Sequence, residues 1–447
     1  MSKIKCLVVG DGGREASIVS RLKDDCIIFS VMRHKNPTIV KAVEETGGVY
    51  IIDNPMNGEV VSQFAKKQEV DIAVVNSDEI LAAGVVDFLQ IEQIPTFGPT
   101  KEGARIEWSK TYGRNLVSEI EPSFNPKHVI VSTEEELTLA FKQFNNEELV
   151  IKPDGLTGGK GVKVMGKHLE NLDEAYNYAK SLLSESNQSN VVIEEKIEGY
   201  EFTIMGITDG ENIVFAPPTF DYPYRFEGDN GPGTGGMGCF THESQLLPFL
   251  TLDDLNNCHK LMSEVVKKIN NDKLLFNGVL NGGFFKLKDG SLRFMEFNAR
   301  IGDPECLNVM ELISNPLSEV IQACIERKLS NELCQFKDSA SIVVYIVSED
   351  YAMGRDSKKI EFKINEESIV RNGAKVIYSA CEMANNQNTL SSVGSSRLAA
   401  IVMEGKSLAS IRQNVYKLLD ECVSGFVDWR KDIASEALLE RMEGFKQ

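Results

Sequence analysis

The residues best suited to chemistry begin in a glycine-rich stretch at 151–165, IKPDGLTGGKGVKVM, which contains Lys152 and Lys160. The stretch departs from the Walker phosphate-binding pattern, because Asp154 stands where the first glycine is needed and Gly161 follows Lys160 in place of serine or threonine. Strand-like segments precede and follow the loop, so it does not open a helix. A glycine-rich hairpin can instead fold over phosphates, as in kinase-type sites. The alternative is a long flexible hairpin with one lysine; we expect the phosphate flap.

A second chemical segment lies at 293–305, RFMEFNARIGDPE. Side chains two residues apart on a strand share a face, so Glu296, Asn298 and Arg300 are expected to point the same way. A carboxylate, an amide oxygen and a guanidinium are costly to bury without a ligand, and oxygen ligands suit Mg²⁺. The alternative is a solvent-facing polar strand with an incidental ion pair. We expect a metal–phosphate site, followed by a turn that contains Asp303.

Two further segments carry polar groups. In VVIEEKIEGYEF at 191–202, a strand edge could pair with an adenine edge, with Glu194 near an amino group and Glu201 near a ribose hydroxyl. Acidic strand ends are also commonly just solvated. In GDGGREAS at 10–17, helix-start amides could bind an anion, although the G-x-G-x-x-G pattern is incomplete. A tight strand-to-helix turn explains the same residues equally well, and Arg14 favours an anionic ligand.

Composition limits the class of function. The 447 residues carry a formal net charge of −18 and a pI near 4.9, which argues against a nucleic-acid groove or a polybasic membrane surface. The nine cysteines show no C-x-x-C spacing, so we expect a reducing cytoplasm and neither a zinc site nor a disulfide framework. No stretch is long enough to span a bilayer, and the N-terminal apolar run is too short for a signal peptide. We expect small-molecule substrates, no nucleic-acid or membrane partner, and a monomer or homodimer.

The elements that must position these residues follow from hydrophobic periodicity. The first hundred residues alternate strand and helix patterns, which predicts a doubly wound α/β domain ending near residue 106. Strands are expected at 4–10, 26–32, 49–53 and 71–76, and helices at 14–25, 58–68 and 79–90.

Beyond residue 106 the pattern changes to short strands and hairpins. Residues 107–330 are expected to form one unit, with a flap subdomain at about 125–196 and a hairpin at 282–300 that turns at Asp289–Gly290. Residues 331–447 are expected to form a small, mostly antiparallel α+β domain.

Taken in order, these motifs resemble the ATP-grasp superfamily and, within it, the phosphoribosylamine–glycine ligase (glycinamide ribonucleotide synthetase) family. The likeness spans nearly the whole chain. It rests on VVGDGGREA near the start, FGPTKEGARIEWSK at 97–110, the glycine-rich stretch, VVIEEKIEGYEFT, NGPGTGGMGCF at 230–240, and GVLNGGFF with FMEFNARIGDPE. Each motif alone is modest, but this order makes the set specific.

The resemblance implies a doubly wound N-terminal (pre-ATP-grasp) domain, a two-lobed ATP-grasp domain and a C-terminal domain. It implies that ATP phosphorylates a carboxylate and that an amine then attacks the acyl phosphate. In that family glycine supplies the carboxylate and 5-phosphoribosylamine the amine, in purine biosynthesis, with Mg²⁺ or Mn²⁺.

The resemblance also implies residue roles. The metal would be bound by Glu296 and Asn298, while Arg300, Asp303 and Lys160 would act on the reacting groups. ATP would be bound by Lys110, Lys152, Gly155, Gly158, Gly159, Gly161, Glu194, Glu195, Lys196, Ile197 and Glu201. The other substrates would be bound by Gly12, Gly13, Arg14, Glu15, Asp221, Arg225, Thr234, Gly235 and Gly236.

Departures from the family pattern fall on the loops expected to face the amine. They are Ala16 for histidine, Asn76-Ser77-Asp78 for G-P-E, Tyr224 for lysine in the segment Tyr222-Pro223-Tyr224, and Gly233 for asparagine, together with YSACE at 378–382 and GSSR at 394–397. Two alternatives therefore stay open: a paralogous ligase for another carboxylate and amine, and a catalytically silent nucleotide-binding relative. The silent relative should lack Glu296, Asn298 or the flap lysine, and all three are present.

Overall fold

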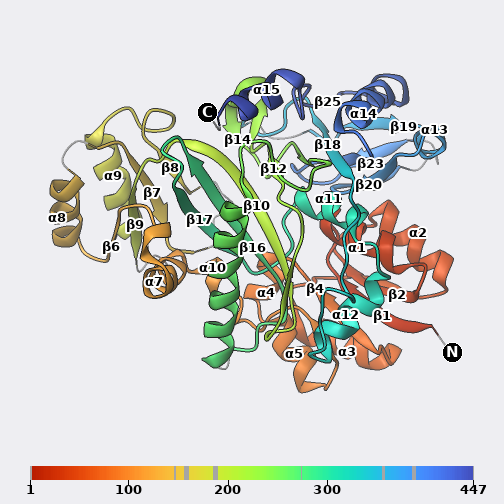
Figure 1. Cartoon of the computed structure of the whole chain (residues 1–447). Helices are drawn as coiled ribbons and strands as arrows, with labels where there is room; N and C mark the ends of the chain where they lie inside the picture. Colours follow the sequence, from red (N-terminus) through yellow and green to blue (C-terminus); the bar gives the residue numbers. More distant parts are fainter. Residues whose placement is uncertain are drawn as a thin grey trace.

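The computed structural model describes residues 3–144, 147–155, 161–184, 190–272, 274–354, 358–384 and 389–445. Figure 1 shows three regions, with the N-terminal domain at the lower right, the C-terminal elements at the upper right and a separate lobe at the left. Gly158, Gly159 and Lys160 of the predicted flap loop lie outside the described residues. Among the described helices, none combines the length and apolar character needed to cross a membrane.

The N-terminal domain is a parallel sheet in the order β3-β2-β1-β4-β5, which confirms the predicted doubly wound domain. Its strands are β1 (Ile4–Val9), β2 (Cys26–Met32), β3 (Tyr50–Ile52), β4 (Ile72–Val75) and β5 (Thr96–Phe97), with helices α1 (Gly13–Leu22), α2 (Pro37–Thr46) and α3 (Gly58–Gln68). The order reverses between β1 and β4, so the loops after these strands flank the crevice where such sheets bind ligands.

The helix predicted at 79–90 is wrong as a single element. The chain forms α4 (Asp78–Ala82) and α5 (Val85–Ile91), separated by Gly84 in the left-handed conformation with φ 79°. A residue with positive φ ends a right-handed helix, and the apolar spacing on both sides of Gly84 did not reveal the break.

The lobe at the left of Figure 1, residues 125–196, is named the flap lobe here. Its sheet has the order β6-β9-β7-β8, from β6 (His128–Val131), β7 (Leu149–Pro153), β8 (Lys163–Val164) and β9 (Val191–Glu195), and it carries α8 (Glu134–Phe144) and α9 (Leu172–Leu183). The apolar side chains of these elements form a core of their own, running from Val131 to Ile193.

A central antiparallel sheet lies beside the flap lobe. Its order is β11-β10-β16-β17, from β10 (Gly199–Thr208), β11 (Ile213–Phe215), β16 (Gly278–Leu287) and β17 (Leu292–Asn298). The β16–β17 hairpin confirms the predicted turn and pairs Gly283 with Glu296 and Asn281 with Asn298. Helices α6 (Arg105–Trp108), α7 (Lys110–Ile120) and α10 (Leu252–Asn271) accompany this sheet.

The C-terminal part contains two antiparallel sheets, which confirms its predicted α+β class. The larger is β12-β15-β18-β23-β20 with β25 beside β18, and the smaller is β21-β22-β19-β24. Two strands of the larger sheet, β12 (Phe220–Asp221) and β15 (Gly238–Thr241), precede residue 331, so this sheet draws on both sides of the predicted boundary.

The remaining elements complete the chain. The strands are β13 (Tyr224–Phe226), β14 (Asn230–Gly233), β18 (Ala340–Ser348), β19 (Glu361–Ile364), β20 (Lys375–Tyr378), β21 (Cys381–Met383), β22 (Leu390–Ser392), β23 (Ala399–Gly405), β24 (Val423–Gly425) and β25 (Val427–Asp428). The helices are α11 (Glu305–Leu312), α12 (Leu317–Ile325), α13 (Glu366–Arg371), α14 (Leu408–Cys422) and α15 (Glu436–Gly444). All nine cysteines are buried and free.

Candidate active site

A pocket lies where the flap lobe meets α7 and β17. Its walls include Lys110 of α7, Lys152 of β7, Glu194 of β9 and Glu296 of β17. These four residues come from sequence segments far apart, and each was predicted to bind ATP or its metal. The fold therefore brings these four predicted residues, from both lobes, to one place.

The Glu194 carboxylate is the centre of a buried ion network. Its Oε1 lies 2.6 Å from Nε of Arg114, and its Oε2 lies 2.8 Å from Nζ of Lys152. Burial alone would raise the pKa of Glu194, but the two cations outweigh it and lower the pKa to about 2. Burial lowers the pKa of Lys152, and the nearby carboxylate opposes that shift. Both oxygens of Glu194 are thus engaged, and its predicted contact with the adenine amino group stays a prediction.

Arg114 was not predicted, although it ties both lobes together. Besides Glu194, its guanidinium donates to the carbonyl oxygens of Phe294 and Met295 at 2.9 Å each. It also lies 4.9 Å from the centroid of the Phe294 ring. An arginine inside the polar helix at 110–120 carries no sequence signal for burial, since only the long-range contact with β9 and β17 creates it.

The start of α7 is bonded to the flap loop. Ser109 caps the helix, and its hydroxyl donates to Asp154 at 3.3 Å while the N–H of Thr111 donates to the same carboxylate at 3.1 Å. Nζ of Lys110 donates to the carbonyl of Gly155 at 2.8 Å. Asp154, the residue that breaks the Walker pattern, therefore accepts one helix-start N–H and the hydroxyl of the capping Ser109 instead.

The segment after β9 was predicted to hold adenosine. Glu195 accepts from the N–H of Lys127 at 2.8 Å, and the Lys196 N–H donates to the carbonyl of Glu148 at 2.7 Å. Ile197 is half-buried. Burial and the neighbouring carboxylates raise the pKa of Glu201 to about 7. The main-chain N–H of Lys196 is thus already used, and the adenosine contacts of this segment stay predictions.

Glu296 and Asn298 lie two residues apart on β17, as the predicted metal ligands require. Within the described residues, the Glu296 carboxylate forms no hydrogen bond or ion pair, whereas Oδ1 of Asn298 accepts from Arg300 at 3.2 Å. Asn281, directly opposite Asn298, is 2% exposed, and its buried Oδ1 has no hydrogen-bond partner in the described part of the chain. This set of oxygen donors fits Mg²⁺ or Mn²⁺. No group of three or more His, Cys, Asp or Glu suited to a metal occurs in the described ranges, so phosphate and water would supply the remaining ligands.

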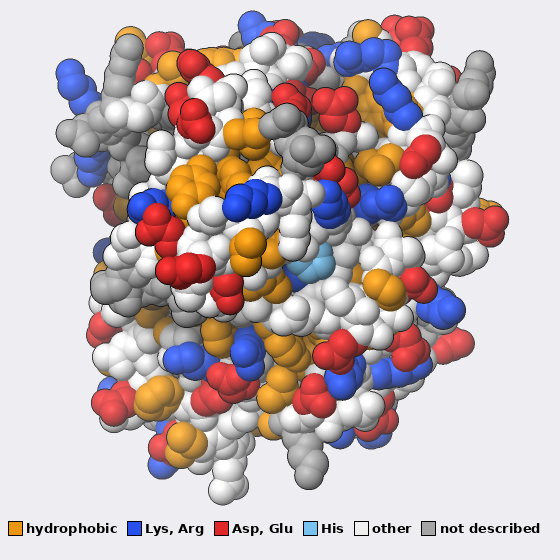
Figure 2. All heavy atoms as spheres, turned by 90° about the vertical axis from the view of Figure 1, so that its left-hand side faces the viewer, with side chains coloured by type: hydrophobic (Ala, Val, Ile, Leu, Met, Phe, Trp, Pro, Cys, Tyr) orange, Lys and Arg blue, Asp and Glu red, His pale blue; other side chains and the backbone are white. Residues whose placement is uncertain are grey.

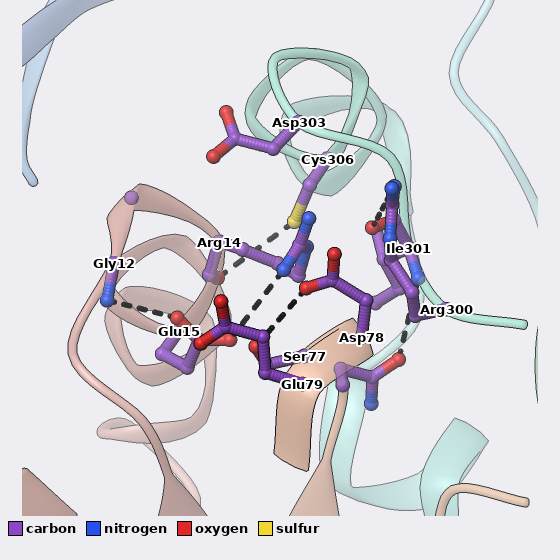
Figure 3. Close-up of polar contacts among 12 residues, drawn as sticks. Gly12, Arg14, Glu15, Ser77, Asp78, Glu79, Arg300, Ile301, Asp303 and Cys306 are labelled. Atoms are coloured by element: carbon purple, nitrogen blue, oxygen red, sulfur yellow. Dashed lines mark hydrogen bonds and ion pairs between the residues drawn. The ribbon is translucent and has the colours of Figure 1, made fainter. Parts of the chain in front are cut away.

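Arg300 is held in place by acidic neighbours. Its Nε lies 3.0 Å from Oε1 of Glu107, whose other oxygen accepts the N–H of Ala299 at 2.9 Å. Burial would lower the pKa of Arg300, but Glu107 and Asp78 outweigh it and raise the pKa. Figure 3 shows Asp78 between Arg14 and Arg300. Burial would raise the pKa of Asp78, and these two guanidiniums lower it overall.

The N-terminal glycine loop differs from the expected open anion site. The N–H of Gly12 donates to Oε2 of Glu15 at 2.9 Å, and the N–H of Gly13 donates to Oγ of Ser379 at 3.1 Å. Burial raises the pKa of Glu15 to about 7, with Arg14 opposing. The N–H groups of Gly12 and Gly13 are therefore both bonded to side chains, and the predicted anion contact of this loop stays a prediction. Among the described residues, Nε of Arg14 is buried without a hydrogen-bond partner, so it is a group that could contact an anion.

A second cluster connects the glycine loop 233–236 with the C-terminal sheet. Arg397 donates to the carbonyls of Gly235 and Gly236 and lies 3.0 Å from Oδ2 of Asp303. Oδ1 of Asp303 accepts from the Tyr345 hydroxyl at 2.7 Å. Asp303 is therefore fixed from two sides, and Arg397 and Tyr345 were not among the predicted site residues.

The other predicted substrate residues are placed as follows. Thr234 donates from its hydroxyl to the Pro223 carbonyl at 3.0 Å. Burial and the carboxylates of Glu305 and Glu201 raise the pKa of Asp221 well above its usual range. The Arg225 side chain is 1% exposed and pairs with Asp428 at 2.8 Å. Its substrate role stays a prediction, and its charge is already compensated.

Several departures from the family pattern have structural uses. Ala16 is fully buried in the core of the N-terminal domain. The Tyr222 hydroxyl accepts the N–H of Ala434 at 2.7 Å. Oδ1 of Asn76 accepts the N–H of Ile301 at 3.4 Å, and its buried Nδ2 has no hydrogen-bond partner among the residues that the structure describes. Ala16 and Tyr222 are therefore both buried, and each makes contacts inside the protein.

Two family models match consecutive parts of the chain. The N domain of phosphoribosylglycinamide synthetase matches residues 4–107, and its ATP-grasp (A) domain matches residues 108–306. The chain is 34% identical to a phosphoribosylamine–glycine ligase of Methanobrevibacter smithii, covering 99% of each chain. It is 35% identical to that of Methanothermobacter thermautotrophicus, covering 98% of each.

Solved structures share the fold. The phosphoribosylamine–glycine ligase of Thermotoga maritima superposes with a TM-score of 0.76 at 23% identity, covering 96% of this chain and 100% of that one. A biotin carboxylase domain from Hydrogenobacter thermophilus, solved with MgADP and bicarbonate, gives 0.72 at 15% identity, covering 99% and 94%. These likenesses confirm the ATP-grasp fold. With both domain matches and more than 30% identity over nearly its full length, the chain belongs to the phosphoribosylamine–glycine ligase (phosphoribosylglycinamide synthetase) family.

Proposed function

We propose that this ATP-dependent carboxylate–amine ligase joins glycine to 5-phosphoribosylamine in purine biosynthesis, in the cytoplasm. The observation that carries the proposal is the pocket that gathers Lys110, Lys152 and Glu296 from three separate elements. Two lysines beside a strand that presents a carboxylate and an amide oxygen are suited to a nucleotide triphosphate and its metal.

The reaction needs no nucleophile from the protein. A carboxylate oxygen of glycine attacks the γ-phosphorus of ATP, the bond to the bridging oxygen breaks, and ADP leaves. The amine nitrogen then attacks the carbonyl carbon of the acyl phosphate. Phosphate leaves with that carboxylate oxygen, and the nitrogen loses one proton, which gives the amide. Catalysis of this kind depends on positioning and charge neutralisation.

The chain's residues divide this task. We assign Lys110 and Lys152 to the ATP phosphates. Arg300, fixed by Glu107 and Asn298, is placed to orient the anionic reacting groups. Mg²⁺ or Mn²⁺ at Glu296 and Asn298 would neutralise phosphate charge. Tyr345 and Arg397 hold the Asp303 carboxylate in place. We assign Asp303, together with Arg300, to orienting the substrates.

A comparison of acids tests the substrate assignment. Phosphate release is measured with ATP, 5-phosphoribosylamine and either glycine or one of a panel of other amino acids. We expect turnover with glycine at least about tenfold above alanine, because one extra methylene in a tight pocket is worth about 1–3 kcal/mol. Turnover on another acid without turnover on glycine would refute the assignment and favour a paralogous ligase.

A further inference from the structure

The flap lobe is packed as a separate body. Its apolar core contains residues from Val131 to Ile193 only, and its strands and helices make their extensive contacts with one another. Figure 2 views the molecule from the side of this lobe and shows Lys, Arg, Asp and Glu side chains interspersed with hydrophobic ones. A body with its own core can move relative to its neighbours, so the position of this lobe depends on a small number of specific contacts.

One set of contacts lies at the base of the lobe, where α7 meets Asp154, Gly155 and Glu194. A second contact connects Lys167, in the turn after β8, with Tyr224 of the β13–β14 hairpin. Nζ of Lys167 lies 3.9 Å from the centroid of the Tyr224 ring, within the range of a cation–π interaction. This turn lies next to Lys196, in the segment between β9 and β10. A Cβ at Gly166 would be only 3.3 Å from Nζ of Lys196.

Tyr224 belongs to a hairpin that the C-terminal segment fixes in place. Arg430, whose side chain is 1% exposed, donates to the carbonyl of Tyr224 at 2.9 Å. Its guanidinium also pairs with Asp229 at 2.8 Å and with Asp432 at 2.6 Å. The N–H of Gly228 donates to Asp432 at 2.9 Å. The hairpin that carries the Tyr224 ring is thus fixed to the C-terminal segment by these hydrogen bonds and ion pairs.

We propose that Tyr224 is a positioning residue that docks the flap lobe in its closed position through Lys167. The contact joins a body with its own core to a hairpin anchored by buried ion pairs, so forming or breaking it changes where the lobe lies. A lysine at position 224 would face Lys167 with a like charge and favour opening. The consequence for nucleotide binding rests on the proposed function, whereas the contact itself does not.

The position of the lobe can be measured without nucleotide. All nine native cysteines are buried, so spin labels can be directed to Leu139→Cys on α8, where the side chain is 59% exposed, and Leu252→Cys on α10, where it is 69% exposed. We expect Tyr224→Leu and Lys167→Met each to increase the open population about fivefold, in keeping with a cation–π contact at an accessible site. Tyr224→Phe, which keeps the ring, should match the parent protein.

The double variant decides whether the two residues act through each other. If they do, Lys167→Met with Tyr224→Leu should open the lobe no more than either change alone. Equal distances in parent and Tyr224→Leu, equal effects of Tyr224→Leu and Tyr224→Phe, or additive effects in the double variant would each overturn the proposal. Thermal unfolding of each variant identifies any that is not folded, and Tyr224→Lys then provides a second opening change, through its like charge with Lys167.

The KM for ATP separates this proposal from the proposed function. With both correct, Tyr224→Leu raises the KM for ATP in proportion to the loss of closed fraction that the spin labels report, by at most about fivefold, and Tyr224→Phe leaves it unchanged. A shift in distance without a shift in KM would support the docking contact and contradict the placement of ATP beneath the flap lobe.

Discussion

Glu296→Ala is expected to lower metal-dependent ATP turnover by about 10³-fold or more. Its carboxylate faces the pocket without a bond to any described residue and lies on the same strand face as Asn298. A bound metal ion stabilises the charged transition state of phosphoryl transfer by several kcal/mol. Each 1.36 kcal/mol of lost stabilisation lowers the rate about tenfold. The measurement is steady-state phosphate release at saturating Mg²⁺, together with calorimetric titration of Mn²⁺ and ADP into the protein.

Glu211 provides a matched control for this experiment, because it is 66% exposed in the turn after β10 and pairs only with Arg327 among the described residues. Glu211→Ala should leave both the rate and Mn²⁺ binding unchanged. Normal Mn²⁺ binding by Glu296→Ala would show that this residue is not a metal ligand, whatever the activity.

Glu194→Ala is expected to lower the free energy of unfolding by about 3–5 kcal/mol, because it leaves two buried cations without their shared carboxylate. Urea unfolding measures this loss. Glu195→Ala is the matched control: the adjacent carboxylate accepts one main-chain N–H at the surface, so its removal should cost about 1 kcal/mol or less. Similar losses of unfolding free energy for Glu194→Ala and Glu195→Ala would contradict the role of Glu194 as the shared partner of the two buried cations.

The stability that Glu194 contributes should also depend on pH. The pKa of Glu194 is lowered to about 2 in the folded protein, from an ordinary value near 4.5. A depressed carboxyl pKa stabilises the fold above the unfolded value, and this contribution is lost as pH falls through the folded value. The difference in unfolding free energy between the parent and Glu194→Gln should therefore have its largest value at pH 6 and decrease as the pH falls from 4.5 to 2.

Local patterns were sufficient for the elements with strong periodicity. The buried run before Gly10 predicted β1, and the Asp289–Gly290 signal predicted the β16–β17 hairpin, since both depend on neighbouring residues alone. The alternation of Glu296, Asn298 and Arg300 on one strand likewise predicted their common face. The break at Gly84 was missed because apolar spacing continues across it.

Long-range contacts explain the rest. Nothing near Arg114 indicates that Glu194 lies beside it, and nothing near Gly13 indicates that Ser379 takes its N–H. The bond from the Gly13 N–H to Ser379 was not foreseen for this reason, because helix-start amides are free only when no other side chain reaches them. Arg397 and Tyr345 were missed for the same reason, although both fix Asp303.

The most direct test of the central claim follows one oxygen atom. Glycine labelled with ¹⁸O in its carboxylate is incubated with the protein, ATP and 5-phosphoribosylamine, and the phosphate and the amide are examined by mass spectrometry. If ATP phosphorylates the carboxylate before the amine attacks, each turnover transfers one ¹⁸O to phosphate and leaves one in the amide. Amide or ADP formation with no ¹⁸O in the phosphate would contradict the account.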